Sequence, residues 1–426
     1  MRIIESPSEV DLIECLVRPS IDTDELENII DSVFNEVNAR GDRALFDYAS
    51  KFDHVELVSL KVSSGDIAIA ENSLPSTLKD AIKKAYENIS LFHEAQVMND
   101  ISVETTSGVE CWQKSIAIDS VGLYIPGGTA PLFSTVLMLG IPAKIAGCDN
   151  VVLCSPPQRN GEIHPATLYA AHLCGIKQIY RVGGSQAIAA MTLGTESVPK
   201  VNKLFGPGNQ YVTAAKQKAQ KYGVAIDLPA GPSEVLVYAD ESANPAFVAA
   251  DLLSQAEHGV DSQVVLVSTS SQIAKKSIEE VKRQTSTLPR KEIVEKCLEN
   301  STALVLPDVN DAYNFINEYA PEHFIIASSN ADEYIPLIKN AGSVFLGNYS
   351  PESAGDYASG TNHTLPTSGY AKSYSGTNLD AFVKKVTFQK LSKAGIQNLG
   401  NTIMTMAREE ELEAHARAVQ IRLENL

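Results

Sequence analysis

The chain has 426 residues and a formal net charge of -17, and this length is enough for two or three domains with cores of their own. The negative charge argues against nucleic acid and anionic membranes as partners, because both would be repelled, and it mildly favours a small cationic substrate. No apolar run is long enough to cross a bilayer, no secretory leader is evident and the six cysteines are scattered without a C-x-x-C pair, so we expect a cytoplasmic protein that contacts no membrane.

The N-terminal part of the chain is predicted to be mainly helical. The first 20 residues show little periodicity, and we expect them to form an arm that packs on another part of the molecule or on another subunit. A helix is predicted to begin at Asp22, with Ile30 on its apolar face, and a second amphipathic helix spans 75–93. A strand is predicted near 109–118.

From residue 121 onwards, short apolar runs alternate with helical patterns. Strand-like runs such as 151–154 and 178–182 form a first block, and a second block extends from 235–238 to 344–346. Such βαβ alternation is typical of parallel sheets that are covered by helices on both faces. The sequence therefore predicts an α/β fold with two doubly wound layers.

Three glycine-rich turns follow predicted strands and open helices, a geometry that presents free backbone N–H groups to a phosphate. None is a complete G-x-G-x-x-G, since Tyr211 takes the third glycine position after Gly206 and Gly208, and no P-loop lysine follows. Two interpretations stay open, namely tight turns that need glycine geometry and a dinucleotide that lies across the strand ends. The turns span 126–129, 183–186 and 206–209.

Two potential metal ligands lie at the end of a predicted helix that stops at Gly259. Gln255 and His258 are three positions apart, so on a helix their side chains would share one face about one turn apart. From this stretch alone, a hydrogen-bonded polar helix terminus is favoured over a metal site.

A long loop rich in Ser, Gly, Asn and Tyr is predicted over 347–376, and such loops are usually functional. Its Asp356, together with Gln255, His258 and His415, would supply a nitrogen and oxygen shell for zinc. His415 lies on the apolar stripe of one long helix predicted over 401–426, which is expected to dock on a partner chain.

Glu322 and His323 are adjacent, just before a predicted strand. They are either a general base with a neighbouring water activator or a hydrogen-bonded structural pair. The residues alone leave open a nucleotide-dependent oxidoreductase with a metal-held substrate and a metal-dependent hydrolase with structural glycine turns. A non-enzymatic binding module is a more distant third hypothesis.

Long ordered motifs extend over nearly the whole chain, at 121–128, 183–190, 205–209, 227–234, 251–259, 321–323, 350–363 and 414–415. Together they resemble those of the histidinol dehydrogenase family. The resemblance implies oxidation of L-histidinol to L-histidine through L-histidinaldehyde, the final steps of histidine biosynthesis, with one Zn²⁺ per subunit and two NAD⁺ consumed per turnover.

The same resemblance implies roles for individual residues. His323 would be the proton acceptor, and Glu322 would activate the water that attacks the aldehyde. Contacts to NAD would come from Tyr124, Gln186 and Asn209. Zinc would be held by Gln255, His258, Asp356 and the partner subunit's His415. Substrate contacts would come from Ser233, Gln255, His258, His323, Asp356, Glu410 and His415, with His363 nearby.

The expected architecture is two incomplete Rossmann-like domains in a domain-swapped homodimer with shared active sites. The N-terminal arm (1–20) and a C-terminal helical segment (377–426) would reach the partner subunit. A discontinuous larger domain (21–120 and 236–376) would carry the catalytic base and most metal ligands, and 121–235 would contact NAD. The turn at 158–164 is expected not to touch the site.

Overall fold

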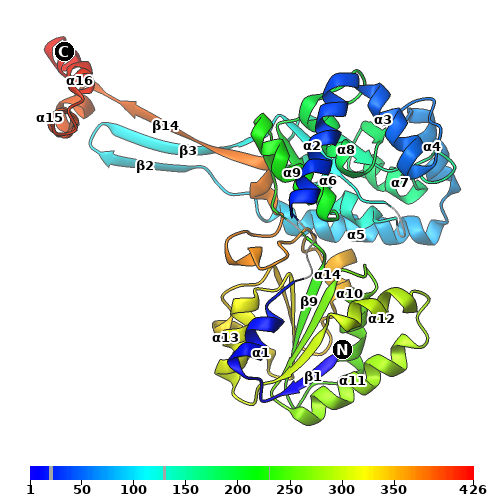
Figure 1. The fold of residues 1–426 in the computed structure, drawn as a ribbon. Helices are drawn as coiled ribbons and strands as arrows, with labels where there is room; N and C mark the ends of the chain where they lie inside the picture. The colour runs from blue at the N-terminus through cyan, green and yellow to red at the C-terminus, as the bar shows by residue number, and fades with distance from the viewer. Residues whose placement is uncertain (19–22, 128–130, 230) are drawn as a thin grey trace. The chain divides into compact units, whose positions relative to one another are not determined.

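The computed structural model describes residues 1–18, 23–127, 131–229 and 231–426 (Figure 1). This part of the chain forms two compact units, and the predicted α/β class with parallel sheets is confirmed. None of the described helices is long and apolar enough to cross a membrane. The larger unit, called the sheet unit below, contains Met1–Ala95 and Asp119–Phe382, and the smaller hairpin unit contains Gln96–Ile118 and Val383–Leu426.

One parallel sheet of the sheet unit has five strands in the order β6-β5-β4-β7-β8. The chain builds it outwards from β4, first through β5 to β6 and then on the other side of β4 through β7 to β8. Connections that diverge in this way favour a ligand crevice at the carboxyl ends of the two central strands. The strands are β4 (Ser120–Tyr124), β5 (Asn150–Ser155), β6 (Gln178–Arg181), β7 (Lys203–Phe205) and β8 (Ala225–Ile226).

Helices cover this sheet because its strands are apolar on both faces. Ile30 and Phe34 of α2 share a buried core with Ala187 of α8 and Leu204 of β7, while α6 packs on β4 and is flanked by α5 and α7. The elements are α2 (Thr23–Arg40), α3 (Asp42–Tyr48), η1 (Ala49–Asp53), α4 (Ser64–Ser73), α5 (Ser76–Glu94), α6 (Phe133–Ala146), α7 (Pro165–Leu173), α8 (Gly184–Leu193), α9 (Gln210–Ala219) and η2 (Gln220–Tyr222).

This packing corrects the predicted domain boundaries. Residues 21–120 were expected to join 236–376, but α2 to α5 cover the five-stranded sheet of 121–226, and 96–118 belong to the hairpin unit. An amphipathic helix shows in its sequence that it needs an apolar partner, but not which sheet provides it.

The second parallel sheet has six strands in the order β1-β11-β10-β9-β12-β13. Along β9, Val235 and Val237 belong to one core and Leu236 and Tyr238 to another, so this strand is buried on both faces. The strands are β1 (Arg2–Glu5), β9 (Glu234–Ala239), β10 (Gln263–Ser268), β11 (Thr302–Val305), β12 (His323–Ala327) and β13 (Ser343–Leu346). Its helices are α1 (Glu9–Cys15), α10 (Pro245–Ala256), α11 (Ser271–Thr285), α12 (Lys291–Glu299), α13 (Val309–Tyr319) and η3 (Ala331–Leu337).

The N-terminal residues were expected to pack on another part of the molecule or on another subunit, and the structure shows the first of these. Residues 2–5 form edge strand β1, in which Ile3 pairs with Ala303 of β11, and Cys15 is buried in a core of the same sheet. The start of the chain is therefore part of a sheet in its own subunit. Pro19, Ser20 and the predicted helix start at Asp22 lie outside the described residues.

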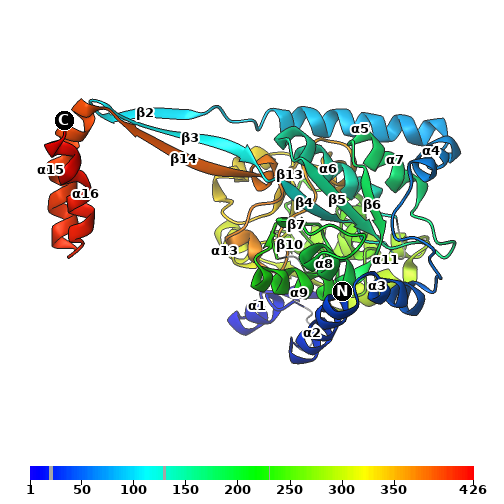
Figure 2. The same ribbon diagram turned by 90° about the horizontal axis from the view of Figure 1, so that it is seen from above.

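The hairpin unit contains an antiparallel sheet in the order β14-β3-β2, followed by two helices (Figure 2). The predicted single helix over 401–426 is wrong, because the chain turns at Glu411, which has a left-handed φ of 59°. The predicted C-terminal helical segment (377–426) also contains a strand, β14, ahead of its two long helices. The elements are β2 (Ile101–Thr106), β3 (Val109–Ala117), β14 (Val383–Leu391), α15 (Lys393–Glu409) and α16 (Glu413–Glu424).

The predicted long loop over 347–376 is partly helical. It contains α14 (Glu352–Tyr357) and the short η4 (Tyr370–Lys372), and η5 (Leu379–Phe382) follows it. Asp356 therefore lies on a helix, one turn after Glu352.

Candidate active site

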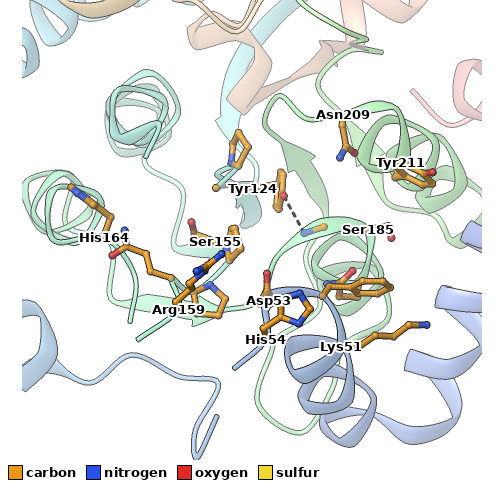
Figure 3. Close-up of a pocket in the computed structure, with 18 of the residues that line it drawn as sticks. Lys51, Asp53, His54, Tyr124, Ser155, Arg159, His164, Ser185, Asn209 and Tyr211 are labelled. Carbon is orange, nitrogen blue, oxygen red and sulfur yellow. Dashed lines mark hydrogen bonds between the residues drawn. The ribbon is translucent and has the colours of Figure 1, made fainter. Parts of the chain in front are cut away.

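A cavity of about 1360 Å³ opens at the carboxyl ends of the five-stranded sheet (Figure 3). Tyr124, Gln186 and Asn209, the three predicted NAD contacts, all line it. Its wall also carries the cations Lys51 and Arg159. A cavity of this size with two cations fits an elongated anionic ligand such as a dinucleotide.

The turns that form this cavity are held by close backbone packing. Gly206 has a φ of 128°, and a Cβ there would lie 2.1 Å from the backbone oxygen of Tyr124. The backbone N–H of Gly184 donates to the Tyr124 hydroxyl (3.0 Å), and burial raises the pKa of Tyr124 to about 12. These glycines are thus required for the turn geometry itself. Gly128 and Thr129 of the first turn lie outside the described residues.

A buried ion pair clamps the turn at Gly206. Lys216 Nζ lies 2.5 Å from Asp227 Oδ1, with 2% and 1% of the side chains exposed. The lysine also donates to the carbonyl of Gly206 (2.9 Å), and Asp227 accepts from the N–H of Gly206 (2.9 Å). Asn209 then caps α9 by accepting from the N–H of Val212 (3.1 Å). The pair therefore fixes the turn that carries Asn209.

The expectation that the turn at 158–164 stays away from the site is wrong. Arg159 and His164 line the cavity. The turn is braced from the sheet by Arg181, which donates to Glu162 (2.6 Å) and to Asp66 (2.8 Å).

A second cluster lies at the amino ends of β9 and β12 in the six-stranded sheet. Glu322 and His323 are buried there, with 5% and 4% of their surface exposed. The N–H of Glu234 donates to Glu322 Oε2 (2.8 Å), and His323 Nδ1 lies 3.4 Å from the carbonyl oxygen of Glu234. A carbonyl can only accept, so this contact places the proton of a neutral His323 on Nδ1 and leaves Nε2, which lies 3.4 Å from Asp356 Oδ1, without a proton.

Carboxylates surround this histidine. His323, Glu352 and Asp356 each offer a ligand atom, and these atoms lie within 4.8 Å of one another. Burial disfavours the charged imidazolium, but Glu352 and Glu322 outweigh it and hold the pKa of His323 well above its usual value. Burial raises the pKa of Glu352. Burial opposes ionisation of Asp356 as well, but His323 keeps the pKa of Asp356 below its usual value.

Several polar atoms in this cluster lack a hydrogen-bond partner among the described residues. They are both amide atoms of the fully buried Gln255, Nε2 of His323 and Oε1 of Glu352. A buried polar group without a partner costs about 1–3 kcal/mol. Carboxylate, imidazole and amide groups can all act as metal ligands, so this set fits a bound cation such as zinc or a cationic ligand.

The structure places the other predicted residues of the sheet unit near this cluster. Ser233 directly precedes β9, and His258 is close enough to add to the effect of His323 in lowering the pKa of Asp356. However, α10 ends at Ala256, so the exposed His258 lies beyond the helix and not on the same helical face as Gln255.

His363 is held by hydrogen-bond contacts at both ring nitrogens. Its Nδ1–H donates to the carbonyl of Asp356 (2.9 Å), and its Nε2 is 3.0 Å from the hydroxyl of Thr135 on α6. This histidine thereby joins the α14 segment to a helix of the five-stranded sheet.

Glu410 and His415 belong to the hairpin unit. Glu410 caps α15 and His415 lies in the first turn of α16, and their roles stay predictions. Glu352 and Lys216 were not predicted as buried site residues, because in the sequence they look like ordinary surface charges. The four-residue spacing of Glu352 and Asp356 on a helix was the available signal.

The family model for histidinol dehydrogenase matches residues 16–423. The chain belongs to the histidinol dehydrogenase family. A curated histidinol dehydrogenase of Bacteroides fragilis is 56% identical to it over 100% of both chains. A curated histidinol dehydrogenase of Campylobacter jejuni is 53% identical over 97% of this chain and 96% of the relative. A crystal structure of histidinol dehydrogenase from Elizabethkingia anophelis gives a TM-score of 0.97 at 54% identity, covering 100% of this chain and 98% of that chain.

Membership of the histidinol dehydrogenase family confirms the resemblance seen in the motifs. It decides among the function classes that the residues left open, because the chain is an oxidoreductase of histidine biosynthesis that acts on histidinol. The hydrolase and the non-enzymatic binding module are thereby excluded.

The Lys216–Asp227 pair gives a prediction about stability. Lys216→Met should destabilise the protein by about 3–5 kcal/mol, because it leaves Asp227 buried without its cation. Lys216→Met combined with Asp227→Asn should recover part of this loss. The measurement is the midpoint of urea unfolding followed by circular dichroism.

Lys218→Met is the matched control on the same helix. Lys218 pairs with Asp31, whose side chain is 59% exposed, so this change should cost less than about 1 kcal/mol. Equal destabilisation by Lys216→Met and Lys218→Met would contradict the claim that the buried Lys216–Asp227 pair holds the turn at Gly206.

Proposed function

We propose that the chain is a zinc- and NAD-dependent enzyme that oxidises L-histidinol to L-histidine through L-histidinaldehyde. The observation that carries this proposal is the buried cluster of Gln255, His323, Glu352 and Asp356, whose unpartnered polar atoms suit a cation that binds an amino alcohol. The cavity lined by Tyr124, Gln186 and Asn209 supports NAD as the oxidant.

The reaction removes four electrons in two steps. The carbinol first loses a hydride to NAD⁺ and a proton to the enzyme, which gives the aldehyde. Water then adds to the aldehyde, and the hydrate loses a second hydride to a second NAD⁺ and releases a proton. NAD⁺ would supply the hydride acceptor, and zinc held by Gln255, His258, Asp356 and the partner subunit's His415 would anchor the imidazole and amine of the substrate.

His323 is the proposed proton acceptor in both steps. With its Nδ1–H directed at the carbonyl of Glu234, its Nε2 can take the proton of the alcohol and later that of the hydrate. The surrounding carboxylates raise the pKa of His323, and a cationic ligand beside Asp356 offsets their charge. Ligand binding thereby favours the neutral imidazole that can accept a proton.

Glu322 is the proposed water activator in the second step. The N–H of Glu234 orients its carboxylate by donating to Oε2 (2.8 Å), and the other oxygen can accept a proton from water. Glu410 would then contact the amine of the substrate.

We also propose that both sheets belong to incomplete Rossmann-like domains and that the protein is a homodimer with shared active sites. The hairpin unit carries Glu410 and His415, and it exposes large apolar side chains that suit a partner surface. They are Ile101, Val103, Phe388, Met406, Leu412 and Ile421. The free cysteines of the chain agree with a cytoplasmic location.

The role of Glu322 predicts a selective defect. Glu322→Gln keeps an oxygen that can accept from Glu234 but removes the base, so oxidation of histidinaldehyde should fall by about 100-fold or more. Oxidation of histidinol to the aldehyde should change much less. Both rates are measured as NADH formation, with histidinol or histidinaldehyde supplied. Equal loss in the two steps would remove the water-activating role.

The metal assignment predicts that a chelator abolishes NADH formation and that added Zn²⁺ restores it. Asp356→Asn and Gln255→Ala should weaken zinc binding by more than about 100-fold, the upper end of the loss that an outer partner causes. The readout is the rise in melting temperature on addition of zinc, which needs no substrate. His172→Gln, at an exposed position of α7, should retain the full rise, and an unchanged rise in Asp356→Asn would refute the assignment.

The shared site predicts complementation between two inactive chains. A His415→Asn chain mixed with a His323→Phe chain should regain about one quarter of the wild-type activity, because half of the dimers are mixed and each has one intact site. Each parent alone should stay inactive while remaining dimeric. Inactive mixed dimers, confirmed by differently tagged chains, would mean that each site is built within one subunit.

A further inference from the structure

A partly buried arginine from the N-terminal segment, Arg18, contacts the strand end that carries the catalytic cluster. Arg18 donates to both carboxylate oxygens of Glu234, at 3.0 Å from Nε and 3.2 Å from Nη2. It also donates to the carbonyls of Leu16 and Tyr319, and its guanidinium lies 3.6 Å from the centre of the Tyr319 ring. A planar guanidinium can make this forked, stacked contact and an ammonium group cannot.

The residue that Arg18 holds is the one whose backbone holds the catalytic pair. The N–H of Glu234 donates to Glu322, and its carbonyl oxygen lies 3.4 Å from His323 Nδ1. Glu234 is the first residue of β9. It pairs with Gln263 of β10, but the pairing of β9 with β12 begins only at Val235, so Glu234 has a strand partner on one side only. The side chain of Glu234 is therefore the natural point at which to fix this peptide.

We infer that Arg18 is a positioning residue for the aldehyde-oxidation step, acting through Glu234 on Glu322. The inference rests on the proposed function, because it requires Glu322 to activate water. Arg18 holds the Glu234 side chain in place, and the peptide N–H of Glu234 then aims the Glu322 carboxylate.

Burial explains why the arginine matters. The side chain of Glu234 is 2% exposed and that of Arg18 is 16% exposed, and burial together with the neighbouring carboxylate of Glu322 raises the pKa of Glu234. Without Arg18, Glu234 would be a second buried carboxylate without a cation beside the catalytic one. It would have to take up a proton or turn towards water, and either change would disturb the peptide that orients Glu322.

The test compares the two oxidation steps in Arg18→Met and Arg18→Lys, using the full-length enzyme. His323 serves both steps and Glu322 only the second. Arg18→Met should therefore lower the rate with histidinaldehyde, relative to the rate with histidinol, by roughly 10-fold or more, as expected for a misplaced catalytic group. Arg18→Lys should lie between wild type and Arg18→Met, because it keeps the charge but loses the fork.

Arg181→Met is the matched control. Arg181 is also a buried arginine with carboxylate partners, but it braces the cofactor cavity, which both steps use. It should lower stability without changing the ratio of the two rates. If Arg18→Met does not fold, Arg18→Met combined with Glu234→Gln removes the uncompensated carboxylate and should still show a lowered ratio.

An unchanged ratio in the Arg18 variants, while Glu322→Gln is selective, overturns the inference and leaves the proposed function intact. A non-selective Glu322→Gln instead overturns the role of Glu322, and the inference falls with it. A lowered ratio in Arg181→Met equal to that in Arg18→Met would show a general effect of losing a buried arginine, and would also overturn the inference.

Discussion

The parallel pairing of β9 with β12 is the contact on which the catalytic cluster depends. The register places His323 opposite Val235. The amino ends of two strands that are far apart in the sequence therefore lie side by side in the sheet. The N–H of Glu234 is then free of the strand ladder and bonds to Glu322. A shift of the register by one residue would turn His323 to the other face of the sheet.

The two candidate sites use opposite ends of their sheets. The cavity of the five-stranded sheet lies at the carboxyl ends of its strands, as is usual for parallel α/β sheets. The cluster of the six-stranded sheet lies at the amino ends, since Glu322 directly precedes β12 and His323 is the first residue of that strand. The amino ends leave backbone N–H groups that the strands do not use, and one of them, the N–H of Glu234, donates to the carboxylate of Glu322.

The sequence was informative where burial leaves a pattern. The β9, β12 and β13 strands were predicted because they are continuous apolar runs, and the long family motifs identified the family of the chain. Position in space was not predictable, since α2 could have packed on either sheet. The turn at Glu411 was also missed, because nothing in its neighbours demands a left-handed residue.

Contacts between charged side chains and buried groups were also not predicted from the sequence. Lys216, Glu352 and Arg18 each look like solvent-exposed side chains in the sequence, and only the surrounding structure shows that each contacts a buried group. Charged residues are seldom buried unless they are paired, so local sequence carries little information about them.

The bond from the Gly184 N–H to the Tyr124 hydroxyl occupies a donor at the start of α8 that could otherwise bind a diphosphate. With NAD as the proposed oxidant, the protein would offer the coenzyme fewer backbone contacts than a full Rossmann crevice does. Loose retention suits a four-electron oxidation, because a spent coenzyme must be exchanged for a fresh one while the aldehyde waits on the enzyme. Tyr124 would in this way favour rapid coenzyme replacement over tight storage.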